Sequence, residues 1–281
     1  MSLPVLRSFR RSPGAVGGVV LLLCIAAAAA SSPWLTPAST GLVRVQDRLL
    51  QPLAVQDGHR HWLGTDALGR DTLSRLLLGA RISLLVGLTA VLIGGSLGTA
   101  IGLLSGYYGG WTDRVIMRLG DIQLAFPFIL FALAVMAVLG PGLGNIIGVL
   151  GLTSWVTYAR VVRSEVLSVR ELEFVQAARA LGAPTVRVLL VHALPNVVGT
   201  VIVVATFSVA STILAEAGLS FLGLGVGAST PTWGSMLADA REYMTDAWWL
   251  TAFPGLSILV TVLGVNLVGD WLRDYLDPRL R

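Results

Sequence analysis

Few side chains in this chain have the types and spacing that catalysis or metal binding requires. His59 and His61 are separated by one residue, and His192 lies far away along the chain. Apart from the His59-x-His61 pair itself, none of the three lies at ligand spacing from carboxylates or thiols. Cys24 is the single cysteine and lies inside an apolar run, so no disulfide within the chain is possible. We therefore predict no metal site and no catalytic residue.

The basic residues exclude one further kind of site. All 20 basic side chains are Arg, and the sequence contains no Lys. A GC-rich genome explains such a bias without any function. The absence still matters, because a P-loop needs a Lys on the β- and γ-phosphates of its nucleotide. If ATP drives a process in which this chain takes part, another polypeptide must bind and hydrolyse it.

The elements that must position any functional side chain are membrane helices. The 281 residues are 54% hydrophobic and 13% charged, with a mean hydropathy of +0.77. A soluble domain carries about twice that charged fraction. Apolar runs of roughly 20 residues recur, which is the length that spans a bilayer as a helix, whereas a β-barrel shows alternating segments of about ten residues. The fold class is therefore an all-α polytopic membrane protein.

Six transmembrane helices are expected in a single transmembrane domain over residues 14–281, after an N-terminal segment 1–13. Their approximate ranges are 14–30, 82–104, 124–139, 145–159, 198–214 and 250–267. Both termini then lie on one side, and most Arg residues fall there, as the positive-inside rule requires of the cytoplasm. Arg75 and Arg81 are exceptions, and we expect them on an interfacial helix that starts at Asp71, where Arg snorkels.

The first apolar run allows a second interpretation. Arg7, Arg10 and Arg11 precede it and Ala28-Ala29-Ala30 end it, which is also the pattern of a cleaved signal peptide. Because further spans follow, an uncleaved first helix is the simpler interpretation.

The second span carries a glycine every four residues, at Gly94, Gly98, Gly102 and Gly106. Residues at this spacing form one stripe along a helix. Since lipid gives no hydrophobic force between helices, the stripe favours close packing of another helix over a merely flexible segment. The sequence does not decide whether that helix belongs to this chain or to a second one.

Two residues at the expected spans are candidates for a pathway or a gate. Pro127 lies at the start of the third span, where proline removes a helix hydrogen bond; it marks either a hinge or a tolerated kink. Glu216 is the one acid that directly adjoins an expected span, which makes it a functional candidate. The alternative is a carboxylate held structurally by backbone N–H groups or by an Arg.

A long polar segment, residues 160–197, interrupts the apolar spans. Phe174, Ala178 and Leu181 share one face of an expected helix over residues 170–181, and Gly182 lies where a C-cap glycine ends a helix. A second short amphipathic helix follows and is expected to end at Pro195. Such a pair is either a docking surface or an ordinary surface helix pair, and the residues alone leave this open.

A resemblance favours the docking surface. The segment resembles the EAA loop of bacterial ABC importer permeases, with Gln176-Ala177-Ala178, Gly182, Leu194 and Pro195 on the pattern. Gln176 replaces the usual Glu, and His192 replaces the usual Ile. Two other segments, 63–84 and 216–234, resemble dipeptide/oligopeptide permeases of the C type, in the peptide/nickel group. These three separated motifs extend the resemblance over most of the chain.

The resemblance implies a multi-pass permease of the bacterial cytoplasmic membrane that does no chemistry itself. The implied partners are a second permease subunit that forms a heterodimer with this chain, two ATP-binding subunits or domains, and an extracytoplasmic substrate-binding protein, but no nucleic acid. ATP and Mg would be bound by the partner subunits, and no cofactor by this chain. Eight residues of the coupling loop are then expected to dock the ATPase: Phe174, Gln176, Ala177, Ala178, Arg179, Gly182, Leu194 and Pro195. Glu216 would meet a peptide amino group.

Several alternatives remain open at this point. Within the same group the substrate is a di- or oligopeptide, a nickel chelate, haem or glutathione. A stand-alone secondary transporter would need intramembrane charges or two inverted halves, and the spans hold almost no ionisable residues. A membrane anchor or assembly factor without any pathway is the third class of function.

Overall fold

The computed structural model describes residues 8–35, 43–56, 58–227 and 230–276. In this part of the chain the fold is almost entirely helical. The long helices, in chain order, are α2 (Pro13–Leu35), α3 (Thr72–Tyr108), α4 (Gly110–Ala125), α5 (Phe128–Leu139), α6 (Leu143–Val169), α9 (Leu194–Phe221) and α11 (Trp249–Leu276). The short elements are η1 (Val45–Asp47), β1 (Ala54–Gln56), β2 (His59–His61), α7 (Glu173–Ala180), α8 (Thr185–Arg187), η2 (Val188–Ala193), α10 (Trp233–Ala240) and η3 (Arg241–Tyr243).

Helices long and apolar enough to cross a membrane confirm the polytopic fold class. Among the described residues there are five such helices, or up to six if the bent pair α4 and α5 forms one span. Most are longer than expected: α3 has 37 residues where 82–104 was predicted, so it extends about 55 Å at 1.5 Å per residue. The helix starts directly after Asp71, whose side chain caps it by accepting from the Ser74 N–H.

The third span, predicted as 124–139, is not a continuous helix. α4 and α5 meet at a bend of 88°, and α5 alone has 12 residues, about 18 Å, too short for a hydrocarbon core of about 30 Å. The break lies at Phe126 and Pro127, because proline cannot donate to the helix and forces the preceding residue into an extended conformation. Pro127 therefore separates two helices, α4 and α5, instead of kinking a single one.

The prediction that a second short helix ends at Pro195 was wrong. α8 and the π-helical η2 continue directly into α9, and residues Thr185–Phe221 pass as one span. Pro195 lies in the first turn of α9. Proline is tolerated inside this continuous span because the π turn η2 directly before it widens the helix, and such irregular turns accommodate a residue without an N–H donor. The inter-span loop is thus shorter than the expected 160–197.

The glycine stripe of α3 faces α6 of the same chain. Added Cβ atoms would lie 1.8 Å from the Ser154 hydroxyl at Gly94, 2.4 Å from the Trp155 carbonyl at Gly98 and 2.7 Å from the Ala159 carbonyl at Gly102. At Gly106 the nearest atom would be the Val166 Cβ, at 2.8 Å. The two backbones approach so closely that no side chain fits between them.

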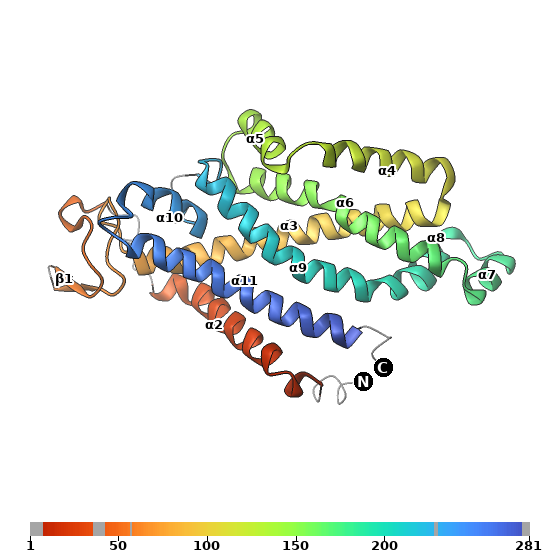
Figure 1. Cartoon of the computed structure of the whole chain (residues 1–281), viewed down its shortest axis with the longest axis horizontal. Helices are drawn as coiled ribbons and strands as arrows, with labels where there is room; N and C mark the ends of the chain where they lie inside the picture. The colour runs from red at the N-terminus through yellow and green to blue at the C-terminus, as the bar shows by residue number, and fades with distance from the viewer. Residues whose placement is uncertain (1–7, 36–42, 57, 228–229, 277–281) are drawn as a thin grey trace.

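The helices run roughly side by side between two ends (Figure 1). α7 lies at one end, toward which α2 begins and α11 ends, and β1 and α10 lie toward the other. We call these the α7 end and the β1 end. α2 packs against α11, where a Cβ on Gly18 would lie 2.8 Å from the Gly264 carbonyl. It therefore packs as an integral helix of the bundle; residues 1–7 of the predicted N-terminal segment lie outside the described residues.

The buried apolar residues form a core along α3. Val86 and Ala90 pack with α5, α6 and α9 toward the β1 end. Leu103 packs with Val162 and with Leu189 of η2 toward the α7 end. α3 thus contacts most other long helices and fixes their positions at both ends of the bundle.

Candidate functional site

The inter-span segment around α7 has a defined stop. Gly182 has φ +77°, and its N–H donates to the Arg179 carbonyl at 2.9 Å. The Ala183 N–H donates to the Ala178 carbonyl at 3.0 Å. These two bonds form a Schellman motif, in which the positive φ is best supplied by glycine. Gly182 therefore ends α7 as the sequence indicated, and Pro184 precedes the next helix.

The outer side of α7 is an exposed, partly apolar surface. Phe174 is 47% exposed and Leu181 is 88% exposed, and Ala178 between them is half-buried. Gln176, Ala177, Arg179 and Ala180 are exposed as well. We call the exposed side chains from Phe174 to Leu181 the coupling surface. Large apolar groups exposed on a short helix outside the bundle are typical of a protein-protein contact.

Contacts of α7, together with one of Arg170 at the end of α6, attach this segment to the rest of the bundle. Val175 is the only buried residue of the helix, with 1% exposure. The Arg179 guanidinium lies 5.6 Å from the centre of the Tyr107 ring at the end of α3. Arg170 donates to the Gly106 carbonyl at 3.0 Å, and the Phe174 and His192 rings lie 6.1 Å apart. Because α7 is held to both α3 and η2, a force on the coupling surface reaches both.

Gln176 occupies the position at which the resembling permeases carry a Glu. Its side-chain amide donates to the Glu171 carbonyl at 3.1 Å. A carboxylate has no N–H with which to make this bond. The substitution therefore stabilises the start of α7 through a bond that the usual residue cannot form.

Leu194 and Pro195 do not belong to the coupling surface. Leu194 packs against the core cluster that contains Leu103 and Val162, and Pro195 lies in the first turn of α9. Both residues start the helix that follows the segment. They position η2 and α9 rather than the exposed side of α7.

Sequence reasoning missed the residues that attach α7. Val175 directly follows Phe174, and the sequence alone does not show which of these two apolar side chains is buried. Tyr107 and Gly106 lie at the end of another helix, and nothing local in the sequence pairs them with Arg179 and Arg170. Only the packing of α3 on α6 brings these groups together.

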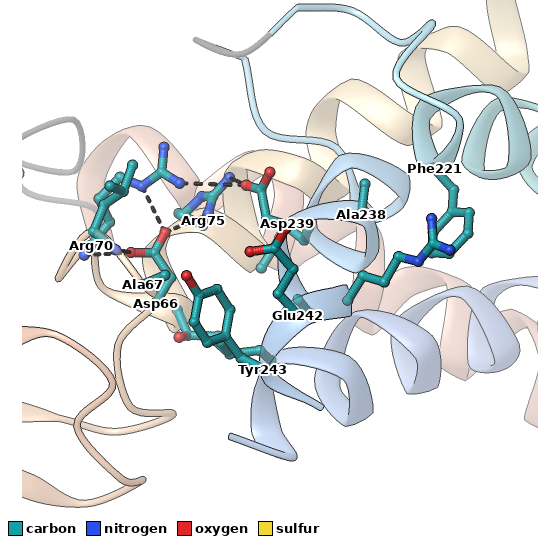
Figure 2. Close-up of a pocket in the computed structure, with 15 residues that line it drawn as sticks. Asp66, Ala67, Arg70, Arg75, Phe221, Ala238, Asp239, Glu242 and Tyr243 are labelled. Carbon is teal, nitrogen blue, oxygen red and sulfur yellow. Dashed lines mark hydrogen bonds and ion pairs between the residues drawn. The ribbon is translucent and has the colours of Figure 1, made fainter. Parts of the chain in front are cut away.

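The β1 end contains a buried ionic cluster (Figure 2). The Asp66 carboxylate accepts from Arg70 Nε at 2.6 Å and from Arg75 Nη1 at 2.5 Å. It also accepts from the N–H groups of Leu68 and Arg70, both at 2.9 Å. Asp239 of α10 lies 2.9 Å from Arg75 and 3.4 Å from Arg70. The cluster joins the segment before α3 to α10, although 164 residues separate Arg75 from Asp239.

This arrangement corrects one expectation and includes one helix that the sequence did not indicate. Arg75 does not snorkel, because its side chain is buried at 6% exposure and paired with two carboxylates; Arg81 is exposed. The segment between Ala215 and Trp248 is not an irregular loop, because α10 forms within it behind a capping box of Thr232 and Ser235. Beside the cluster lies a cavity of about 480 Å³, which Phe221, Asp239 and Tyr243 also line.

Glu216 is buried in α9 with 0% exposure. Its carboxylate accepts from the Ser220 hydroxyl at 2.6 Å and from the Ser83 hydroxyl at 3.4 Å. The Ser83 hydroxyl in turn accepts from the Trp233 N–H at 3.3 Å. Among the described residues, neither backbone N–H groups nor an Arg hold the carboxylate, contrary to both details of the structural alternative. Hydroxyls of α3 and α9 hold it instead, and in this state it does not face an open pathway.

The described residues contain no group of three or more His, Cys, Asp or Glu side chains placed to hold a metal ion. His61 has a different partner, because its Nδ1 lies 3.2 Å from Asp71, the residue that caps α3. This contact ties the small β1–β2 hairpin to the start of α3.

Family models and curated relatives match nearly the whole chain. The model described as "Binding-protein-dependent transport system inner membrane component" matches residues 98–281. A second model, described as "N-terminal TM domain of oligopeptide transport permease C", matches residues 4–52.

The curated relatives are transport permeases. A di/tripeptide transport system permease protein of Pseudomonas aeruginosa is 46% identical over 98% of this chain and 91% of its own length. A dipeptide transport system permease protein of Alkalihalophilus pseudofirmus is 42% identical over 98% of this chain and 89% of its own. A glutathione transport system permease protein of Escherichia coli O157:H7 is 43% identical over 98% and 89%.

Proposed function

The chain belongs to the family of binding-protein-dependent transport system inner membrane components, and we propose that it forms half of a pathway for di- and oligopeptides. In this proposal it works in an ATP-driven importer of the bacterial cytoplasmic membrane, with both termini in the cytoplasm. The α7 end then faces the cytoplasm and the β1 end faces outward.

The partners follow from this function. A second permease subunit completes the pathway, two ATP-binding subunits or domains bind ATP and Mg, and an extracytoplasmic binding protein delivers the substrate. The chain itself binds no cofactor and hydrolyses nothing. A stand-alone secondary transporter or a simple anchor receives no support from family membership or from the relatives' names.

One observation carries the proposal: an exposed coupling surface is attached to the core of the bundle. Leu181 and Phe174 are available to a partner, while Phe174 also contacts His192 of η2, and Arg179 and the preceding Arg170 contact the end of α3. When ATP closes the ATPases, a rigidly attached α7 passes their movement to α3 and α9. Nucleotide shifts the balance of two permease states only as far as it binds one state better.

Co-purification tests this proposal. An affinity-tagged chain, solubilised from its native membrane, is expected to carry two ATP-binding subunits or domains and a second permease. Recovery of the chain alone, with solute flux after reconstitution, contradicts the proposal. In the matched variant, Glu replaces the exposed Leu181, a change that leaves the bundle intact. We expect this variant to recover about tenfold less of the ATPases, which corresponds to the loss of a contact worth about 1.4 kcal/mol.

Glutathione is the second candidate substrate, because permeases named for glutathione transport are about as similar as those named for dipeptides. To separate the two candidate substrates, the uptake of a labelled dipeptide is measured with and without glutathione as a competitor. If excess glutathione leaves the uptake of dialanine unchanged, the result supports a peptide as the substrate.

A further inference from the structure

A second cavity, of about 720 Å³, lies among α6, α9 and α11 at the α7 end. Its polar lining comes from Ser164, Glu165, Ser168, Asn196, Thr200 and Arg273. These residues occupy the last turns of α6, the first turns of α9 and the last turn of α11. None of them belongs to the coupling surface or to the ionic cluster at the β1 end.

The lining is unusual for helices that are otherwise apolar. Ser164 and Ser168 are exposed on one face of α6, one turn apart. A surface that faces lipid would not gather three hydroxyls, an amide and two opposite charges, because polar groups in hydrocarbon are costly. This face is therefore expected to line water or a polar ligand.

Glu165 adds a second indication. A carboxylate near the C-terminus of a helix opposes the helix dipole, so Glu165 does not stabilise α6. Its side chain accepts a hydrogen bond from the Thr200 hydroxyl, and it forms no ion pair among the described residues. One oxygen of this carboxylate is thus held in place by α9, and the other has acceptor sites for a cation.

The two charged groups of the cavity differ in sign and come from different helices. Glu165 of α6 fits an ammonium group, and the Arg273 guanidinium at the end of α11 fits a carboxylate. The hydroxyls and the Asn196 amide fit the peptide groups between them. A short peptide with free ends has these three features, and a cavity of about 720 Å³ is large enough for a dipeptide.

We propose that this cavity is a substrate subsite at the inner end of the pathway, where Glu165 binds the free ammonium group of a peptide. The inference rests on the proposed function and goes beyond it, because it assigns a substrate contact to named residues. Arg273 faces the peptide carboxylate in this site. Because α7 follows α6 directly, a bound peptide lies next to the segment that the ATPase moves.

Thiol protection tests the subsite in the assembled transporter. Cys24 is the single cysteine of the chain, so Cys24→Ser gives a background into which Ser168→Cys places one thiol. In inside-out vesicles, the rate at which a charged thiol reagent labels this chain is measured with and without saturating dialanine. Dialanine is expected to slow the labelling of the introduced thiol several-fold by occupying the site. N-acetyl-dialanine, which has no free ammonium group, is expected to leave the labelling rate unchanged. When Glu165→Gln is added, dialanine should no longer slow the labelling.

Two controls separate the possible outcomes. Leu172→Cys lies exposed just after α6 and outside the cavity, and its labelling should not respond to dialanine. A phosphatidylethanolamine headgroup carries the same pair of charges, so vesicles of phosphatidylcholine with and without this lipid are compared. Protection by the lipid but not by dialanine overturns the subsite and assigns a headgroup instead.

Uptake measured in parallel distinguishes this proposal from the one on which it rests. If right-side-out vesicles take up labelled dialanine with ATP but Ser168→Cys shows no protection, the subsite is wrong and the importer stands. If the unsubstituted complex takes up neither dialanine nor glutathione, the proposed function fails, and the subsite fails with it.

Discussion

At the scale of single residues, burial decides what each charged group does. Asp66 and Arg75 are almost completely enclosed, and each has the other within 2.5 Å. Asp239, by contrast, has a side chain that is 50% exposed. A buried charge that loses its partner keeps its desolvation cost, whereas an exposed one is solvated by water.

The ionic cluster gives a graded prediction. Arg75→Gln leaves Asp66 with Arg70 as its only basic partner and should lower the free energy of unfolding by about 3 kcal/mol. Asp239→Asn should cost no more than about 1 kcal/mol, because its carboxylate is half-exposed. Thermal unfolding of the purified protein measures both, and Arg81→Gln is the control at an exposed Arg of the same helix. Equal effects of Arg75→Gln and Arg81→Gln would contradict the structural role of the cluster.

For Glu216, in contrast, we predict that a conservative substitution leaves substrate affinity unchanged. The hydroxyls of Ser220 and Ser83 donate to it, and a Gln side-chain oxygen accepts from the same donors. Glu216→Gln is therefore expected to leave the apparent affinity for free-amine peptides unchanged in uptake assays. A clear rise in KM for dialanine, with no rise for its N-acetylated form, would restore the ligand role that the sequence suggested.

At the scale of elements, the stop of α7 depends on one backbone conformation. Gly182 has φ +77° and nothing within 4 Å of an added Cβ, so a substitution there changes conformational strain without causing a clash. Gly182→Val should strain the Schellman turn by roughly 1–2 kcal/mol and uncouple ATP hydrolysis from uptake. Gly182→Asn, which tolerates this conformation, is the matched control. Normal uptake by the Val variant, with its ATPase still bound, would remove α7 as the docking element.

The contact between α3 and α6 can be tested in the same way. At Gly98 an added Cβ would lie 2.4 Å from a backbone carbonyl, so Gly98→Ala forces the helices apart. We expect a loss of about 1–3 kcal/mol, as for other overpacked sites. Gly148→Ala on α6 meets nothing within 4 Å and should be neutral. Thermal unfolding of the two variants measures the difference, and similar melting temperatures would show that the helices separate at little cost.

The elements also show how far the sequence predicts this fold. Apolar runs located the long helices and glycine spacing located a close contact, since both are local patterns with a single physical cause. The Gly182 stop was predictable for the same reason. The break at Pro127 and the continuous helix through Pro195 were not predictable. Proline occurs both where a helix ends and in the first turn of a helix, and the local sequence does not distinguish the two cases. The contacts of Arg75 with Asp239 and of Arg179 with Tyr107 depend on tertiary packing that no local pattern encodes.

At the scale of the whole molecule, α3 connects the two ends. Arg75 near its start binds α10 through Asp239, and Gly106 and Tyr107 near its end contact the segment around α7. Between them, the glycine stripe holds α3 against α6. A displacement of α7 therefore moves a helix that reaches the opposite end of the bundle, as expected of a permease driven from one side.

The central claim is that the coupling surface contacts an ATP-binding partner on the cytoplasmic side. In the Cys24→Ser background, Gln176→Cys places one thiol of this chain on that surface. We predict that a short bifunctional reagent cross-links it to the ATP-binding subunit in the intact complex, and that added nucleotide changes the yield. Labelling of the same thiol only from the outer face of intact cells, with no cross-link to any ATPase, would contradict the account.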